Sequence, residues 1–149
     1  MYWQLKMWIS FIHYICLQEF DLKNMLNTLG KGEKLKSKKA IEKLFHEGQR
    51  LRAFPLQMNF LKMDHSGKLP YKVGFSVPKR LVKLAVNRNR IKRLMREAYR
   101  TNKDAFSTTS ADKYVVMFIY GTEEILTYEK LEGAMKKLAS KFNNKQSES

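Results

Sequence analysis

The seven residues from Tyr114 to Tyr120 (YVVMFIY) are all apolar or aromatic, and this run constrains the fold more than any other part of the sequence. A strand with one face in water alternates polar and apolar residues, whereas a continuously apolar strand is typical of a sheet covered on both faces. The run therefore predicts a strand in a sheet that lies between two layers.

Two earlier segments, Phe54–Phe60 and Tyr71–Val77, alternate apolar and polar residues as half-buried strands do. Residues 64–70 between them (DHSGKLP) are typical of a turn, and Pro78 closes the second strand. Three other segments have the i, i+3, i+4 apolar spacing of a helix that packs on one face. The predicted bounds of these helices are Ser37 to Gly48, Asn87 or Asn89 to about Lys103, and from Thr127 through Phe142.

The predicted order is α-β-β-(β)-α-β-α, in which the strand in parentheses is optional. Residues 104–112 are expected to form a loop before the apolar strand. Without repeats, this order predicts an α+β fold (an α/β sandwich): one small sheet covered by helices.

The expected domain comprises residues 33–143, preceded by an extension, residues 1–32, and followed by a polar tail, 144–149, that frays. The apolar run from Met7 to Leu17 lacks the basic flank and the cleavage site of a signal peptide. Three interpretations of the extension are open: an extra helix, a segment that touches a membrane, or an assigned start codon that lies upstream of the true one. We favour the last, with translation beginning at Met25.

The single cysteine, Cys16, excludes an internal disulfide and a cysteine-rich zinc site. No segment approaches the roughly 18 uninterrupted apolar residues of a spanning helix. A cytoplasmic domain without membrane contact is expected.

Basic residues outnumber acidic ones by 29 to 14, and the excess of +15 is concentrated in one segment. Residues 72–103 contain eleven Lys and Arg side chains, opposed only by Glu97. On a helix, Arg88, Lys92 and Arg96 form one ridge of an exposed basic side. Such a concentration indicates a polyanion partner, because neutralised phosphates release their counterions. A solvated basic helix without a special role is the alternative.

The sequence from Val73 to Tyr99 resembles the signature of the bacterial ribonuclease P protein component. It contains VGFSVPKR (residues 73–80), then AVNRNRIKR (85–93) and REAY (96–99). The family has V-G-x-S-V-x-K-[KR] followed by R-N-R-x-K-R-x-x-R-[EQ]-A-[FY]. The resemblance extends over about residues 33–140. This chain departs from the family in having Lys83-Leu84 where Gly-Asn is common, and Ile41 in place of one of two phenylalanines in the first helix.

The resemblance implies a protein subunit of ribonuclease P, whose RNA subunit uses bound Mg²⁺ to hydrolyse the phosphodiester at the 5′ end of mature tRNA. The protein itself would hold no metal, cofactor or catalytic residue. Its implied partners are ribonuclease P RNA and precursor tRNA, with no protein partner. The resemblance also implies a left-handed crossover between parallel strands, against the usual right-handed preference.

The resemblance also assigns two sets of binding residues. Contacts to the RNA subunit are expected from Lys79, Arg80, Arg88, Asn89, Arg90, Lys92, Arg93, Arg96 and Arg100. A cleft for the single-stranded 5′ leader, between the first helix and the sheet, is expected to include Phe45, Phe54, Tyr71, Lys72, Phe75 and Ser76. Core packing is the competing interpretation for the four aromatic residues, and helix capping is the competing one for Asn89. Alternation leaves open which face of the strand meets the leader.

Three other classes of protein remain as alternatives. A generic RNA- or DNA-binding module shares the charge but not a role in tRNA processing. A basic domain anchored to anionic lipid would use the apolar N-terminus. A protein-only nuclease would need paired carboxylates or a positioned histidine. The candidates for that chemistry lie in unrelated contexts: His13, His46, His65, Asp64, Asp104 and Asp112.

Overall fold

The computed structural model describes residues 29–106 and 111–148. Predictions for residues 1–28, including Met25, His13 and Cys16, lie outside the described residues. Four strands form one sheet in the order β1-β2-β4-β3. Their bounds are β1 Gln49–Ala53, β2 Leu56–Lys62, β3 Tyr71–Ser76 and β4 Tyr114–Tyr120. β2 pairs antiparallel with β1 and β4, whereas β3 and β4 are parallel.

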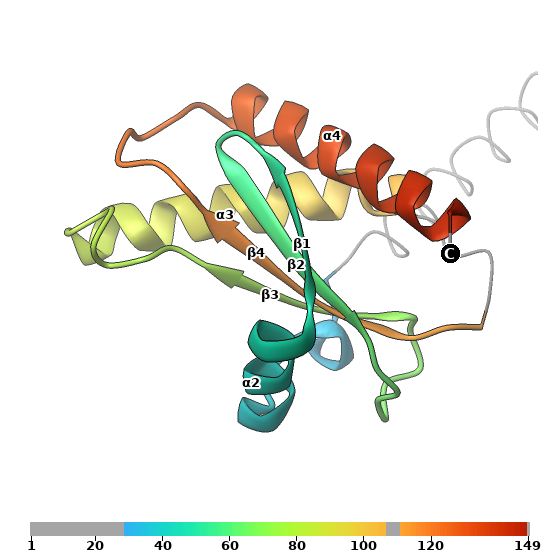
Figure 1. Cartoon of the computed structure of the whole chain (residues 1–149). Helices are drawn as coiled ribbons and strands as arrows, with labels where there is room; N and C mark the ends of the chain where they lie inside the picture. Colours follow the sequence, from blue (N-terminus) through green and yellow to red (C-terminus); the bar gives the residue numbers. More distant parts are fainter. Residues whose placement is uncertain (1–28, 107–110, 149) are drawn as a thin grey trace, which may run out of the picture.

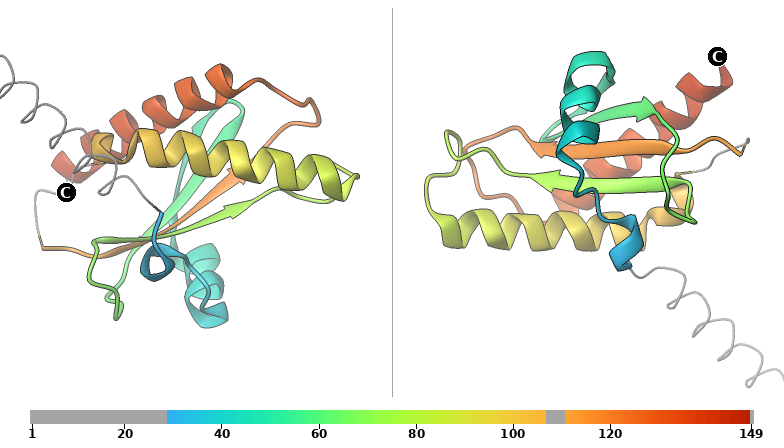
Figure 2. Two further views of the ribbon diagram at one scale, coloured as in Figure 1. Left: turned by 180° about the vertical axis from the view of Figure 1, so that it is seen from behind. Right: turned by 90° about the horizontal axis from the view of Figure 1, so that it is seen from below.

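Helices cover the sheet unequally on its two faces (Figures 1 and 2). Their bounds are η1 Lys31–Glu33, α2 Lys38–Glu47, α3 Ala85–Thr101, η2 Lys103–Ala105 and α4 Tyr128–Ser147. α3 and α4 pack on one face, whereas the short α2 covers only part of the other. The predicted α+β sandwich is confirmed.

The apolar run of β4 is explained by these two layers. Val116, Phe118 and Tyr120 belong to the large core that α3 and α4 build. Val115 and Met117 point the other way, into a smaller core with α2. Because both sides of β4 are covered, no position in it can be polar without a burial cost.

The connection from β3 through α3 to β4 is left-handed, as the family resemblance implied. In Figure 1 both strands run toward the left, α3 returns behind the sheet, and β4 lies above β3. A connection that runs left along one strand, returns behind the sheet and continues in the strand above forms a left-handed turn, which is rare among such crossovers. The crossover carries α3 along the β3 edge of the sheet.

Several boundaries differ from the sequence predictions. The extra strand, β1 (Gln49–Ala53), precedes the two predicted strands, whereas the optional strand was expected after them. The strand predicted from Phe54 begins at Leu56, because Phe54 and Pro55 form the turn of the β1–β2 hairpin. Ser37 caps α2 as predicted, since its hydroxyl accepts a hydrogen bond from the Ala40 amide (3.4 Å).

The last two helices also differ at their ends. α3 begins at Ala85, before either predicted asparagine, and Leu84 precedes it without a side-chain cap. The polar residues expected to fray instead continue α4 to Ser147. The end of this helix is held by buried Phe142 and by a hydrogen bond from the Asn143 side-chain Nδ2 to the Ala105 carbonyl oxygen (2.7 Å). Thr127 precedes α4, but its side chain caps nothing.

Gly48→Ala and Gly133→Ala are expected to change stability in opposite directions. A Cβ atom at Gly48 would overlap the carbonyl oxygen of Leu44, so the end of α2 must shift, at a cost of about 1–3 kcal/mol. A Cβ at Gly133, inside α4, meets no atom within 4 Å, and the better helix propensity should add about 0.5–1 kcal/mol. The urea concentration at the unfolding midpoint, measured for each variant, tests both predictions. Equal shifts in the two variants would contradict the argument that the overlap with Leu44 sets the cost at Gly48.

Candidate RNA-binding surface

α3 presents a basic side because its apolar side is fixed against the sheet. Ile91, Met95, Ala98 and Tyr99 are buried in the core below the helix. With 3.6 residues per turn, the basic residues must then occupy the remaining outer surface of α3. Lys79 and Arg80, both exposed, continue this surface in the loop before the helix.

Two of the nine residues predicted to contact the RNA subunit are engaged within the chain. Arg88 donates from Nη1 to the carbonyl oxygens of Val82 (3.0 Å) and Lys83 (2.6 Å), and thereby holds the loop before α3. Arg100 makes a two-pronged contact with Glu97, with distances of 3.0 Å from Nε and 2.6 Å from Nη2 to the carboxylate oxygens. Arg88 therefore has a structural role, and the charge of Arg100 is largely neutralised.

The remaining cations of α3 have no ion pair or hydrogen bond with the described part of the chain. We call these four residues the outer cations: Arg90, Lys92, Arg93 and Arg96. All are exposed except Lys92, which is half-buried. Unpaired arginines are well suited to phosphates, because the planar guanidinium donates two parallel hydrogen bonds.

Asn89 lies in the second turn of α3, so the capping interpretation is wrong for this residue. Its side chain is exposed and makes no hydrogen bond with a described residue. An amide with free donor and acceptor atoms, flanked by arginines, can read a base edge or bind a phosphate.

Glu97→Gln is expected to raise the affinity for RNA several-fold. The hydrogen bonds from Arg100 lower the pKa of the Glu97 carboxyl, so the pair persists at neutral and mildly acid pH. Removing the carboxylate frees the Arg100 guanidinium to bind a phosphate. The plot of log affinity against log salt concentration should then steepen by about the slope that one phosphate contact contributes. Filter-binding titrations at several salt concentrations measure this; an unchanged slope would show that Arg100 faces no phosphate. Glu129→Gln, at an exposed position on α4, is the matched control.

The six residues predicted to line the leader cleft do not share one surface. Tyr71 and Phe75 lie on the face under α3 and α4. Tyr71 is buried against Tyr114 and Phe142, with ring centres 6.1 and 6.0 Å away. Phe75 stacks on Phe118 at 5.7 Å. The structure supports the core-packing interpretation for both residues.

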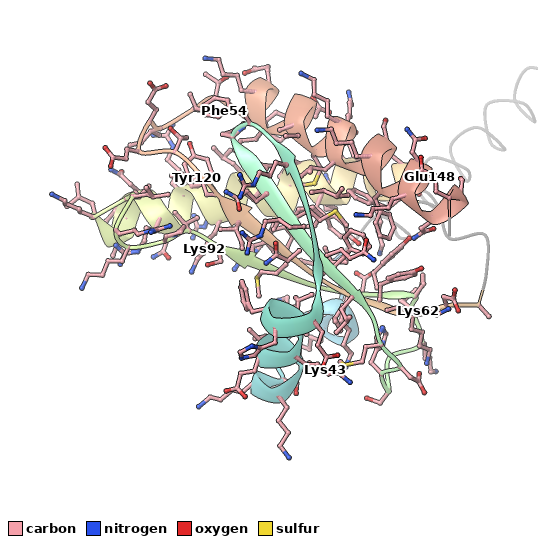
Figure 3. All side chains as sticks on the ribbon, viewed as in Figure 1. Lys43, Phe54, Lys62, Lys92, Tyr120 and Glu148 are labelled. Atoms are coloured by element: carbon pink, nitrogen blue, oxygen red, sulfur yellow. The ribbon has the colours of Figure 1, made fainter. Side chains whose placement is uncertain are left out.

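Phe54 is 73% exposed at the tip of the β1–β2 hairpin. Figure 3 shows it at the opposite end of the molecule from Lys43 on α2. It therefore cannot belong to a cleft beside that helix. Lys72 and Ser76 face the α2 side, and Phe45, on α2 itself, is 47% exposed.

The open part of the α2 side contains residues that the sequence analysis missed. Strand register aligns Arg52, Gln57 and Ile119 in one row with the predicted Ser76. Arg50 and Asn59 begin the next row, which continues to Met117 and Gly74 beneath the small core with α2. Arg50 donates from Nε to Oδ1 of the buried Asn59 (3.3 Å). The sequence feature that could have identified these arginines is the alternation in QRLRA (residues 49–53), because residues two positions apart in a strand lie on the same face. We call the row of Arg52, Gln57, Ile119 and Ser76, together with Arg50, the open sheet face.

The described residues contain no group of three or more His, Cys, Asp or Glu side chains that could hold a metal ion. In the same part of the chain, no helix combines the length and the apolar character needed to cross a bilayer. Of the candidate acids, Asp64 lies 3.5 Å from Lys113 and Asp112 lies 2.8 Å from Lys62, in ordinary ion pairs.

An α+β domain with helices on both faces of its sheet, and with one helix whose arginines lack partners among the described residues, has the features of the nucleic-acid-binding class. The family model described as Ribonuclease P matches residues 29–143. The ribonuclease P protein component of Chlorobaculum tepidum is 39% identical over 104 residues, 63% of this chain and 68% of that protein. That of Porphyromonas gingivalis is 31% identical over 113 residues, 73% of this chain and 82% of that protein. The chain belongs to the ribonuclease P protein family.

Solved structures of this family share the fold. The ribonuclease P protein of Thermotoga maritima superposes with a TM-score of 0.59 at 21% identity, covering 73% of this chain and 96% of that one. A Staphylococcus aureus structure gives a TM-score of 0.58 at 19% identity, covering 72% and 93%.

Proposed function

We propose that this chain is the protein subunit of a ribonuclease P in which RNA carries out the chemistry. The observation that carries the proposal is the set of outer cations on α3. They sit within the family motif and have no partner among the described residues. Ribonuclease P RNA supplies the phosphates that would neutralise them, and the cytoplasm is where we place the complex.

The open sheet face is the surface we assign to the single-stranded 5′ leader of precursor tRNA. Its arginines, Arg50 and Arg52, can pair with backbone phosphates, while the half-buried Ile119 offers an apolar contact to an unpaired base. Phe45, Lys72 and Ser76 remain candidates on this side. Tyr71, Phe75 and Phe54 are withdrawn because of where the structure places them.

The role of the protein is to bind and to orient. Among the described residues, the carboxylates lie in ion pairs or apart, so we assign hydrolysis to the RNA subunit. Mg²⁺ belongs to that RNA, and we assign no metal ligand or cofactor to the protein. By neutralising phosphates of both RNAs, the protein lowers the repulsion between catalyst and substrate.

Cleavage of a precursor tRNA at low Mg²⁺, with a bacterial ribonuclease P RNA, tests the proposal. We expect cleavage at the mature 5′ end with RNA and protein together, and none with protein alone. Protein that binds RNA without changing this rate would favour a generic RNA-binding module. Cleavage by protein alone would overturn the division of roles.

A further inference from the structure

A recess on the outer side of α3 is lined almost entirely by apolar atoms, although two of its lining residues are arginines. It has a volume of about 540 Å³ and is lined by Val86, Asn89, Arg90, Arg93 and Leu94. Val86 is 78% exposed, the most exposed of the large apolar side chains in the described structure. Leu94 is half-buried beside it, one edge of its side chain packed on the core.

The arrangement follows from helical spacing. Val86, Arg90 and Leu94 lie at successive i, i+4 positions and form one row, while Asn89 and Arg93 form the neighbouring row. Two arginines and two aliphatic residues therefore share one side of α3. Asn89 also lines the recess, and its side chain makes no hydrogen bond within the described part of the chain.

Phosphate binding alone does not account for this composition. A regular RNA helix presents phosphates and sugars to a protein surface and would leave Val86 against water or charge. An unstacked base has a flat apolar face for Val86 and Leu94 and a π-surface on which arginine stacks. Its polar edge suits an asparagine amide, which matches adenine by two hydrogen bonds.

We propose that this recess receives one unpaired base of ribonuclease P RNA, with adenine the best match. This inference rests on the proposed function and adds to it a base-specific contact beside the phosphate contacts of α3. Charge complementarity selects RNA as the occupant, because Arg90 and Arg93 belong to the recess and none of its lining residues in the described structure is acidic. The flanking phosphates of the same nucleotide would reach these arginines.

Dimethyl sulfate footprinting of ribonuclease P RNA with the full chain tests the inference. Wild-type protein is expected to protect an unpaired adenine, and Val86→Ser and Asn89→Ala are expected to lose that protection. Both variants should bind RNA roughly tenfold more weakly, in line with the loss of one stacked base. Their salt slope should stay unchanged, because no charge is removed.

Ile125→Ser is the matched control, since Ile125 is also exposed (49%) but lies outside the recess. Circular dichroism verifies that all three variants fold. If the Val86 and Asn89 variants give the same footprints and affinities as the control, the recess does not bind a base. That result would leave the proposed function intact. A wild-type protein that binds no ribonuclease P RNA would instead overturn the proposed function and the recess together.

Discussion

Replacing the four outer cations of α3 with glutamine is expected to weaken binding to ribonuclease P RNA by about 10³-fold at about 0.1 M monovalent salt. Each phosphate contact contributes about 0.7–0.9 to the slope of log affinity against log salt, so four contacts account for roughly three units. Glutamine keeps the helix and most of the side-chain volume. Titrations over a range of salt concentrations should show the loss in affinity and in slope together.

A control with the same change in net charge separates local contacts from a general electrostatic effect. α4 carries four exposed lysines that can be changed to glutamine in the same way: Lys130, Lys136, Lys137 and Lys141. We expect this variant to lose far less affinity than the α3 variant. Equal losses would show that RNA responds to net charge alone and that α3 is not the binding surface.

The sequence predicts α3 well because its two sides obey different rules. Ile91 and Met95 are buried in the core, whereas the basic residues of the helix lie on its other side. A single helical periodicity therefore identifies both the helix and its exposed basic side. The same logic identifies β4, since an unbroken apolar run can only lie between two layers. Both predictions depend on spacing within one element.

The open sheet face was missed because it depends on spacing between elements. Alternation showed that Tyr71 and Phe75 share one face of β3, but not which face α3 would cover. That choice follows from the hand of the crossover, which local sequence does not determine. Arg50 and Arg52 likewise reach the open sheet face only because β1 pairs with β2. Intramolecular partners, such as Glu97 for Arg100, were visible as i, i+3 spacing but were read as free charge.

Glu33→Gln is expected to lower the free energy of unfolding by about 3–5 kcal/mol, the usual cost of breaking a buried ion pair. Glu33 is 1% exposed, pairs with Lys103 after α3, and accepts a hydrogen bond from the Gly30 amide (3.0 Å). The neutral amide keeps the shape and the acceptor but removes the charge that balances the Lys103 ammonium, whose side chain is only 17% exposed. Urea unfolding should show a lower midpoint with an unchanged slope.

This pair matters because it joins two segments that flank the parallel strands. Residues after Glu33 run beside β3, where the Leu35 amide donates to the Val73 carbonyl (3.0 Å), and Lys103 ends the crossover through α3. Glu47→Gln, which breaks the exposed Lys43–Glu47 pair, is the control and should cost no more than about 0.5 kcal/mol. Combining Glu33→Gln with Lys103→Met should recover part of the loss, because the unbalanced charge is then gone. A single Glu33→Gln effect as small as that of Glu47→Gln would show that the Lys103 ammonium is accommodated without Glu33, so this ion pair does not hold the two segments together.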